Sequence, residues 1–496
     1  MSVLTTINFQ LPNGPNDIKQ LGNLQGASLS IAIAEIAQQF AGLAIVIVPD
    51  FVTAFKLERE LSFFQVPIVH FPDWETLPYD NFSPHQDIIS QRLAALYNLP
   101  NFTRGVLIIP ISTLMHRICP QAYIDQSTFI LATGDKLDLI EMRRKLERCG
   151  YQNNSQVMEH GEFTVRGSIL DIFPMGSEYP YRIDLFTDEV ETIRQFDPES
   201  QRSLNQVKDI RLLPAREYPF TEEAIAQFRT NWRDRFTGDP RTCPMYQDVS
   251  QGIKAAGLEY YLPLFFPQTA TLFDYLPSNK LIIRVGNIHE AAQEFWQNVN
   301  NRFEQYSHDI TRPLLDVNEI FITPEEIFSL TKQAPQIKCE LQQITLGAGQ
   351  YNLATQLLPE ISAQAKMQDL FLNLKEFIRT TSARILFCAE SSGRKLVLEE
   401  LLNKQNIHPE NIASWAEFLT ADCKLGLAIA PLETGIILTA ANIAIVTESE
   451  LLGRRVMQRR RRKSKAIDPT AAISNLAELT IGAPVVHIEH GVGRYL

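Results

Sequence analysis

The stretch that decides the fold of this chain covers residues 157–204 and reads VMEHGEFTVRGSILDIFPMGSEYPYRIDLFTDEVETIRQFDPESQRSL. Apolar and polar residues alternate through much of it, which is the pattern of β-strands with one buried and one solvated face. In its second half, Ile183 and Leu185 fall on one face, and Arg182 and Phe186 fall on the other. The stretch therefore predicts a small β-meander.

The predicted solvated face of this meander carries an aromatic ring between arginines. Arg166 alternates with the apolar Phe163 and Val165, so it falls on the same face as Arg182 and Phe186. Aromatic residues and arginine are enriched in protein-binding hot spots, which makes Phe186 a candidate anchor for a protein partner. The alternative interpretation is that Phe186 closes the hairpin end against its own domain. The pattern alone leaves both interpretations open.

Length and composition indicate a multidomain globular protein. A chain of 496 residues, 45% of them hydrophobic and 21% charged, suits roughly three or four domains with buried cores. Its net charge of −11 offers no global attraction for nucleic acid, so DNA binding would need a local basic patch. The six cysteines form no CxxC pair, which argues against a zinc site and favours reduced thiols in the cytoplasm. We find no signal peptide pattern and expect no membrane span.

Short apolar strands alternate with helical patterns in the N-terminal and C-terminal parts of the chain, which predicts parallel sheets with helical crossovers. The predicted strands are residues 43–48, 106–110, 281–285, 384–388, 425–430 and 444–447. The predicted helices are residues 28–40, 51–64, 87–97, 135–149, 222–233 and 393–402. Asp135 is the expected N-cap of the fourth of these helices.

Three stretches carry a resemblance to a known family: residues 73–93, DWETLPYDNFSPHQDIISQRL, residues 157–167, VMEHGEFTVRG, and residues 484–495, PVVHIEHGVGRY. Together they make the chain resemble the bacterial transcription-repair coupling factors over essentially its whole length. The resemblance implies a multidomain α/β protein. Its first domain would be a degenerate helicase-like parallel-sheet domain, similar to the repair protein UvrB, with an inserted α+β domain that binds UvrA. A small α/β domain would follow.

The resemblance also implies boundaries and site residues. The expected segments are the UvrB-like domain at 1–121 and 214–345, its insert at 122–213, the small domain at 350–455, a basic linker at 456–478, and the start of an RNA-polymerase-interacting domain at 479–496. The chain would thus be about the N-terminal two-fifths of such a protein. In the family, the UvrA contact maps to Arg166, Arg182 and Phe186. These are the positions that the alternation places on the solvated face, which favours the anchor interpretation.

The segment before the helix at 28–40 stands where a UvrB-like ATPase has its phosphate loop. A working loop needs a lysine and a hydroxyl residue directly after its second glycine. Gly22 and Gly26 remain here, but Ala27 and Ser28 stand where that pair is needed. We therefore expect an inactive loop, although the free amides of a helix start could still hold an anion weakly.

The second catalytic element of such ATPases is also missing from the sequence. The strand at 281–285 runs into Gly286 and Asn287 instead of the acidic pair that holds magnesium. We expect no catalytic residue, no metal site and no cofactor in this chain. For full-length relatives, the resemblance implies a motor that uses ATP and magnesium to translocate on double-stranded DNA.

A basic run at residues 454–465, RRVMQRRRRKSK, is the main nucleic-acid candidate. It has eight basic residues and no acid, so it could neutralise phosphates without sequence specificity. The candidate contacts are Arg459, Arg460, Arg461 and Arg462. The alternative is a solvated connector that its own charge keeps extended.

Several smaller features have a functional and a structural interpretation. Tyr79, Phe82 and His85 could stack on single-stranded DNA, or form a packed loop that leads into the next helix. The SSGRK sequence at 391–395 could bind an anion or cap a helix. The remaining candidates are the pair His487 and His490, which lacks a third metal ligand, and the pair His116 and Cys119, which lacks a general base.

These observations and the resemblance together predict a non-catalytic recruitment module. It would bind UvrA through the face of Arg166, Arg182 and Phe186, and would bring excision repair to stalled RNA polymerase in the cytoplasm. One alternative is a UvrB-like ATPase with degenerate motifs. The other is a DNA-binding module that uses residues 454–465.

Overall fold

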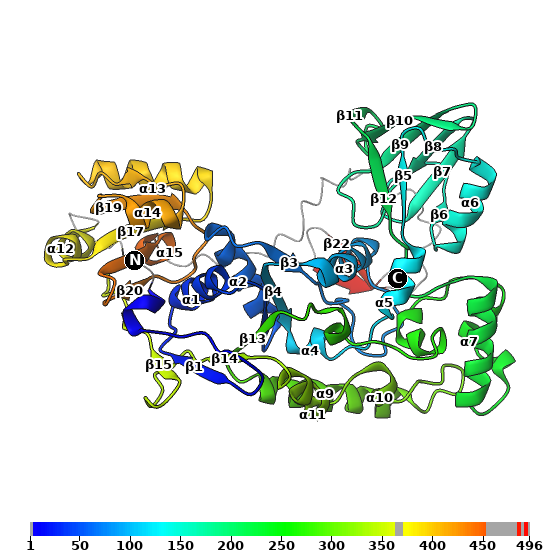
Figure 1. Cartoon of the computed structure of the whole chain (residues 1–496), viewed down its shortest axis with the longest axis horizontal. Helices are drawn as coiled ribbons and strands as arrows, with labels where there is room; N and C mark the ends of the chain where they lie inside the picture. Colours follow the sequence, from blue (N-terminus) through cyan, green and yellow to red (C-terminus); the bar gives the residue numbers. More distant parts are fainter. Residues whose placement is uncertain (1–2, 363–370, 453–483, 488–490, 495–496) are drawn as a thin grey trace. The chain divides into compact units, whose positions relative to one another are not determined.

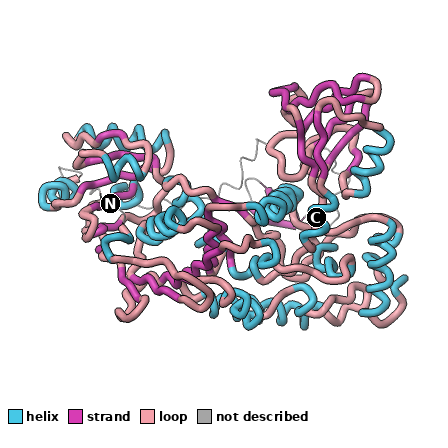
Figure 2. The backbone as a smooth tube through the Cα atoms, viewed as in Figure 1, coloured by secondary structure: helices cyan, strands magenta, loops and turns pink. Residues whose placement is uncertain are grey.

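The structure is a computed structural model that describes residues 3–362, 371–452, 484–487 and 491–494. The chain divides into two compact units, Met1–Leu452 and Gly453–Leu496. In the second unit, β22 (Pro484–His487) and β23 (Gly491–Arg494) form an antiparallel pair. All other described elements belong to the first unit, and Figure 2 shows how helices and strands are distributed along the backbone.

A seven-stranded parallel sheet organises the first unit, in the order β15-β1-β14-β13-β2-β4-β3 (Figure 1). Its strands are β1 (Ile18–Gly22), β2 (Leu43–Val48), β3 (Ile68–His70), β4 (Gly105–Pro110), β13 (Lys280–Val285), β14 (Gln336–Cys339) and β15 (Gln350–Asn352). Every residue of β2 and β4 is buried, as continuous apolar strands between two helical layers should be. Strands β1–β4 and β13–β15 meet in this sheet, so the meander, which lies between β4 and β13 in the sequence, belongs to an insertion.

Helices cover the two faces of the large sheet. Apolar side chains of α1 (Ser28–Gln39) and α2 (Phe51–Phe63) share one core with one face of β2. Side chains of α3 (Gln86–Asn98) and α9 (Ile288–Tyr306) share a second core with its other face. The remaining α-helices of this region are α4 (Ile111–Leu114), α5 (Gln121–Ser127), α7 (Glu222–Arg235), α8 (Pro244–Ser250), α10 (Val317–Ile320) and α11 (Pro324–Thr331).

The insertion contains the predicted meander, which is confirmed. Its six-stranded sheet has the order β11-β10-β9-β8-β7-β6. The strands are β6 (Gln152–Asn153), β7 (Glu162–Arg166), β8 (Ile169–Ile172), β9 (Tyr181–Phe186), β10 (Glu189–Phe196) and β11 (Ser203–Val207). The apolar face of this sheet is buried in one core with α6 (Leu139–Arg148). An antiparallel pair, β5 (Phe129–Ala132) and β12 (Asp209–Leu212), lies where the chain enters and leaves the sheet.

The prediction that Asp135 caps α6 is wrong. The N-cap is Asp138, whose carboxylate accepts hydrogen bonds from the backbone N–H groups of Ile140 and Glu141. Leu137 instead donates its backbone N–H to Asp188, so the chain is still extended there and cannot yet be helical. Asp135 accepts from the Ala132 N–H and stabilises the preceding turn.

A small α/β domain completes the first unit, with a sheet in the order β16-β20-β21-β17-β19-β18. Its strands are β16 (Thr355–Gln356), β17 (Arg384–Ala389), β18 (Glu410–Asn411), β19 (Leu425–Ile429), β20 (Ile436–Leu438) and β21 (Ile443–Thr447). Its helices are α12 (Leu372–Thr380), α13 (Ser392–Lys404), α14 (Trp415–Thr420) and α15 (Glu448–Leu452). The multidomain α/β class is therefore confirmed, whereas the domain boundaries stay predictions. β15 pairs with β1 of the large sheet, although we expected the small domain to begin at residue 350.

Candidate functional site

Phe186 is the last residue of β9 and projects from the end of a tight hairpin. It pairs with Glu189, and Thr187 adopts a left-handed φ of 60° in the turn between them. The residue remains 72% exposed. The interpretation that Phe186 closes the hairpin against its own domain is therefore wrong. An aromatic ring so exposed is available to a partner.

A buried carboxylate holds the two arginines of this face. The side chain of Asp171 in β8 is fully buried and lies opposite Arg182 in the sheet. Arg182 donates from Nε to Oδ1 of Asp171 at 2.8 Å and from Nη2 to Oδ2 at 3.0 Å. Arg166 donates from Nη2 to the same Oδ2. Because an ion pair orients both guanidinium groups, the face is organised before a partner arrives.

The two arginines are not equally accessible, which corrects the prediction that both lie on a fully solvated face. The Arg166 side chain is 53% exposed, but that of Arg182 is only 20% exposed. The Arg182 guanidinium lies 4.9 Å from the ring centroid of Phe196 and donates to the Gln201 carbonyl at 3.4 Å. Its hydrogen bonds to Asp171 raise the pKa of Arg182. Arg182 thus positions the face, and Arg166 has more capacity to bind a carboxylate.

The sequence pattern did not single out Asp171, because a single acidic residue between apolar residues is common in strands. The alternation of polar and apolar residues nevertheless places Asp171 on the polar face of β8, next to two strands whose polar faces carry arginine. Asp184 follows the same logic, since it accepts from Thr192 at 3.0 Å and pairs with Arg194. We call the surface of Arg166, Asp171, Arg182 and Phe186 the arginine–phenylalanine face.

The glycine loop after β1 is filled by protein. Gly22 ends β1, and Gly26 has a φ of 53° directly before α1. The backbone N–H of Ala27 donates to the Thr434 carbonyl at 2.9 Å. A Cβ atom on Gly26 would lie 2.6 Å from the Gly435 carbonyl oxygen, and Ser28 is fully buried. The Ala27 amide is therefore not free to hold an anion, because a carbonyl of the small domain accepts it, and anion binding by the other amides of this helix start stays a prediction.

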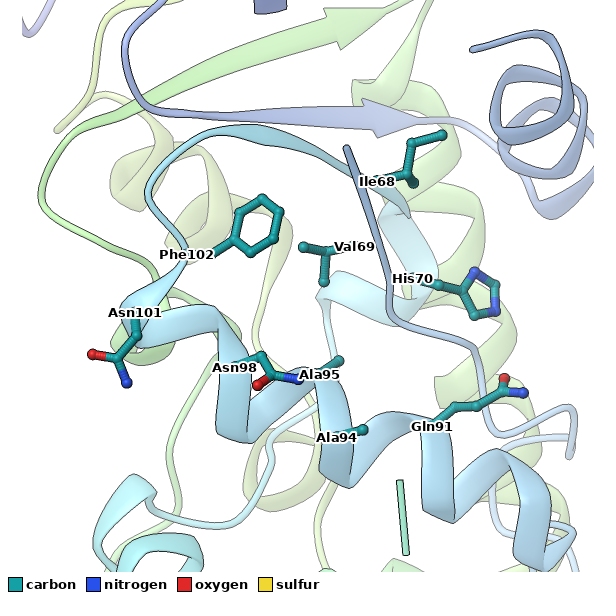
Figure 3. A pocket seen from close by; sticks show the side chains of 9 residues that line it. All are labelled: Ile68, Val69, His70, Gln91, Ala94, Ala95, Asn98, Asn101 and Phe102. Carbon is teal, nitrogen blue, oxygen red and sulfur yellow. The ribbon is translucent and has the colours of Figure 1, made fainter. Parts of the chain in front are cut away.

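Two cavities of the first unit are lined by residues that indicate no particular ligand or reaction. One, of about 650 Å³, lies between β3 and α3, and Figure 3 shows the apolar Val69 and Phe102 above the helix that carries Gln91 and Asn98. His70 is the one ionisable side chain among its nine described lining residues. The other, of about 660 Å³, opens over Arg284 beside β13 and β14. No set of three or more potential metal ligands gathers among the residues that the structure describes.

The smaller sequence candidates resolve into structural roles where the structure describes them. Tyr79 is buried and donates to the Leu315 carbonyl at 3.1 Å, which confirms the packed-loop interpretation for that residue, whereas Phe82 is 70% exposed. Ser391 accepts from the Arg394 N–H and caps α13, as the capping interpretation requires. Residues 454–465 lie outside the described residues, as does His490. None of the described helices is both long and apolar enough to span a bilayer.

His116 and Cys119 are buried, and they show no sign of a nucleophile with its base. Burial raises the pKa of Cys119 and lowers the pKa of His116 to about 4. Nδ1 of His116 is a buried atom with no hydrogen-bond partner among the described residues, and its ring packs edge-on against Trp74 at 4.8 Å. His116 is therefore a neutral core residue.

We expect His116 to make the first domain acid-sensitive. The unfolded histidine takes up a proton near pH 6.5 and the folded one only near pH 4, so stability should fall as the pH drops through this window. Between pH 6.5 and pH 5 the loss should be about 2 kcal/mol. Denaturant unfolding of wild type and His116→Phe at both pH values checks this. An equal loss in both proteins would contradict it.

Comparison with known proteins assigns two regions of the chain, the insertion and the small α/β domain. Residues 129–218, which contain the arginine–phenylalanine face, match the UvrB interaction domain, and residues 377–451 match the MFD, D3 domain. The chain is 42% identical, over 98% of its length, to transcription-repair-coupling factors of Escherichia coli and Haemophilus influenzae. The chain is thus similar to part of the transcription-repair-coupling factors over almost its own whole length. The Bacillus subtilis member is 24% identical over 96% of the chain. The chain spans about two-fifths of the length of these family members, 42% in each case.

Proposed function

We propose that this chain recruits UvrA through the arginine–phenylalanine face and so brings excision repair to stalled RNA polymerase. The observation that carries the proposal is the exposed ring of Phe186 on the sheet face that also carries the guanidinium groups bound by Asp171. The match of residues 129–218 to the UvrB interaction domain supports it, because the resemblance to UvrB implies that this insert binds UvrA.

The chemistry of this face fits a partner with an apolar pocket next to acidic groups. Phe186 would fill the pocket, and burial of a side chain of this size contributes about 2–3 kcal/mol. Arg166, still half exposed, would bind a carboxylate at the rim. Arg182 would act mainly by holding its neighbours, since most of its donors are already used within the sheet.

We further propose that the chain itself does not hydrolyse ATP. Ala27 stands where the phosphate-binding lysine is needed, and the Thr434 carbonyl accepts the backbone N–H of Ala27. ATP, magnesium, double-stranded DNA and RNA polymerase would be ligands and partners of the full-length relatives, in the cytoplasm. DNA binding by residues 454–465 is the alternative function, and it rests on the sequence alone.

Phe186→Ala tests the recruitment proposal. We expect it to lower UvrA affinity by about 2 kcal/mol, or roughly thirtyfold, as for a hot-spot aromatic residue. Thermal unfolding should not change, because the ring packs on little of its own domain. Ile140→Ala is the matched control, since Ile140 is 67% exposed in α6 of the same insertion. Equal UvrA affinities for the two variants would remove this face from the interaction.

A further inference from the structure

The small α/β domain is fastened to the glycine loop by its own backbone. The contact segment is residues 433–435, directly before β20. The Thr434 carbonyl accepts the Ala27 N–H at 2.9 Å, and the Gly435 carbonyl leaves no room for a side chain at Gly26. Both contacts lie at the first strand–helix turn of a parallel sheet, the position where α/β proteins commonly bind phosphates.

An acidic side chain reinforces the contact from α2. Glu60 is buried, and it accepts the backbone N–H of Glu433 at 3.2 Å and the hydroxyl hydrogen of Ser30. Lys56 Nζ lies 3.8 Å from the carboxylates of both Glu60 and Glu433. Burial raises the pKa of Glu60. Since buried carboxylates need partners, this cluster depends on the small domain being in place.

Apolar packing continues the same interface. Buried side chains of α1 and α2 share one core with side chains of the small domain, among them Ile412, Trp415 and Leu432. The rings of Phe64 and Trp415 meet edge to face with their centroids 5.8 Å apart. At the periphery, Arg59 pairs with Glu390 at 2.8 Å. A shared core of this kind makes independent motion of the two parts costly.

We propose that the small domain serves as the permanent occupant of the phosphate cradle, taking the place that a nucleotide has in an ATPase of this architecture. The amides at the start of α1 need an acceptor, and the partial negative charge of the Thr434 carbonyl supplies one where a phosphate would otherwise sit. The cradle, at its Gly26–Ala27 turn, is therefore a protein-docking socket. This role does not depend on UvrA binding.

The socket has a clear mechanical consequence. Because the cradle, the Glu60 cluster and the shared core all bridge the two parts, the large sheet and the small domain should unfold together. The cradle should also exclude nucleotide without any change in conformation, because the small domain already occupies it. A relative with an open cradle would show the opposite behaviour, with nucleotide stabilising the fold by mass action.

The glycines of the chain provide a matched test. Gly26→Ala adds a Cβ that would lie 2.6 Å from the Gly435 oxygen, whereas Gly286→Ala, at the end of β13, meets nothing within 4 Å. Both glycines have positive φ, 53° and 67°, so the two variants share the same backbone strain. We expect amide exchange in β17, β19 and β21 to become at least tenfold faster in Gly26→Ala than in Gly286→Ala. Equal exchange in the two variants would overturn the proposal.

Lys56→Gln gives a second measurement in case Gly26→Ala does not fold. It removes the cation between the two domains. Lys338→Gln is its control, because Lys338 in β14 pairs with Glu340, which directly follows the same strand of the large sheet. We expect about threefold faster exchange in the small domain for Lys56→Gln only. Addition of MgATP should leave the thermal unfolding of the wild-type chain unchanged. Stabilisation by MgATP, or identical exchange in the two lysine variants, would count against the socket.

Discussion

Replacing Arg182 with Glu should lower the free energy of unfolding of the insertion by about 3–5 kcal/mol, in the absence of any partner. The change puts a second carboxylate against Asp171, which has no exposed surface and would lose its bidentate partner. Among the residues that the structure describes, Arg166 is the one remaining cation bonded to Asp171, and it makes a single hydrogen bond to it. Chemical denaturation, monitored by amide exchange in β8 and β9, measures the loss.

Arg143→Glu is the control for this prediction. Arg143 lies on α6 of the same insertion and pairs with Glu147 at 3.0 Å on the helix surface, where ion pairs contribute little. A similar loss of stability in both variants would show that Asp171 does not need Arg182. If the prediction holds, loss of UvrA binding by Arg182→Glu reports on folding as well as contact. Phe186→Ala is then the cleaner test of the interface.

The two faces of the meander could be predicted because strand alternation is a local property. Residue parity is enough to place Arg182 and Phe186 on one side of β9. Parity also places Asp171 on the polar face of β8, but its pairing with Arg182 could not be predicted in this way, because the pairing depends on the register between β8 and β9. A one-residue shift in register would place it elsewhere, and a single sequence does not fix the register of strands joined by a long connection.

The cradle illustrates a second limit of local reasoning. The sequence shows that Ala27 cannot supply the lysine that a phosphate loop needs, since this follows from side-chain identity alone. It gives no indication that the Thr434 carbonyl fills the space, because Thr434 lies far along the chain and contributes only backbone atoms. The prediction of the α6 N-cap was wrong for a related reason. Asp135 and Asp138 have the same propensity for an N-cap position, and the hydrogen bond from the Leu137 N–H to the Asp188 carbonyl decides between them.

Removal of Glu217 should be among the most destabilising single changes in the first domain. Glu217 and Arg92 are both fully buried, and Arg92 donates from Nη2 to Oε2 of Glu217 at 3.2 Å and from Nη1 to the Pro72 carbonyl at 2.9 Å. Trp74 Nε1 donates to the same carboxylate at 3.3 Å. Glu217→Ala leaves a buried guanidinium without a counter-charge, and we expect a loss at the upper end of about 3–5 kcal/mol.

The position of this ion pair gives the loss a specific consequence. Glu217 follows β12, where the chain returns from the insertion, and Arg92 is in α3 of the first domain. The pair therefore fastens the return of the insertion to the large sheet, and Glu217→Ala should loosen both regions in one transition. The half-exposed pair of Arg235 and Glu319, 2.7 Å apart, is the control, and Glu319→Ala should cost under about 1 kcal/mol.

A double variant separates loss of charge balance from loss of packing. Replacing Arg92 and Glu217 together, by Leu and Gln, removes the unpaired charge and should recover much of the stability that Glu217→Ala loses, because a buried ion pair can often be exchanged for neutral residues of similar volume. Equilibrium unfolding in urea measures all three variants. If the double variant is no more stable than Glu217→Ala, then the carboxylate acts through its hydrogen bond with Trp74 and through packing, and the charge of Arg92 is not what destabilises the fold.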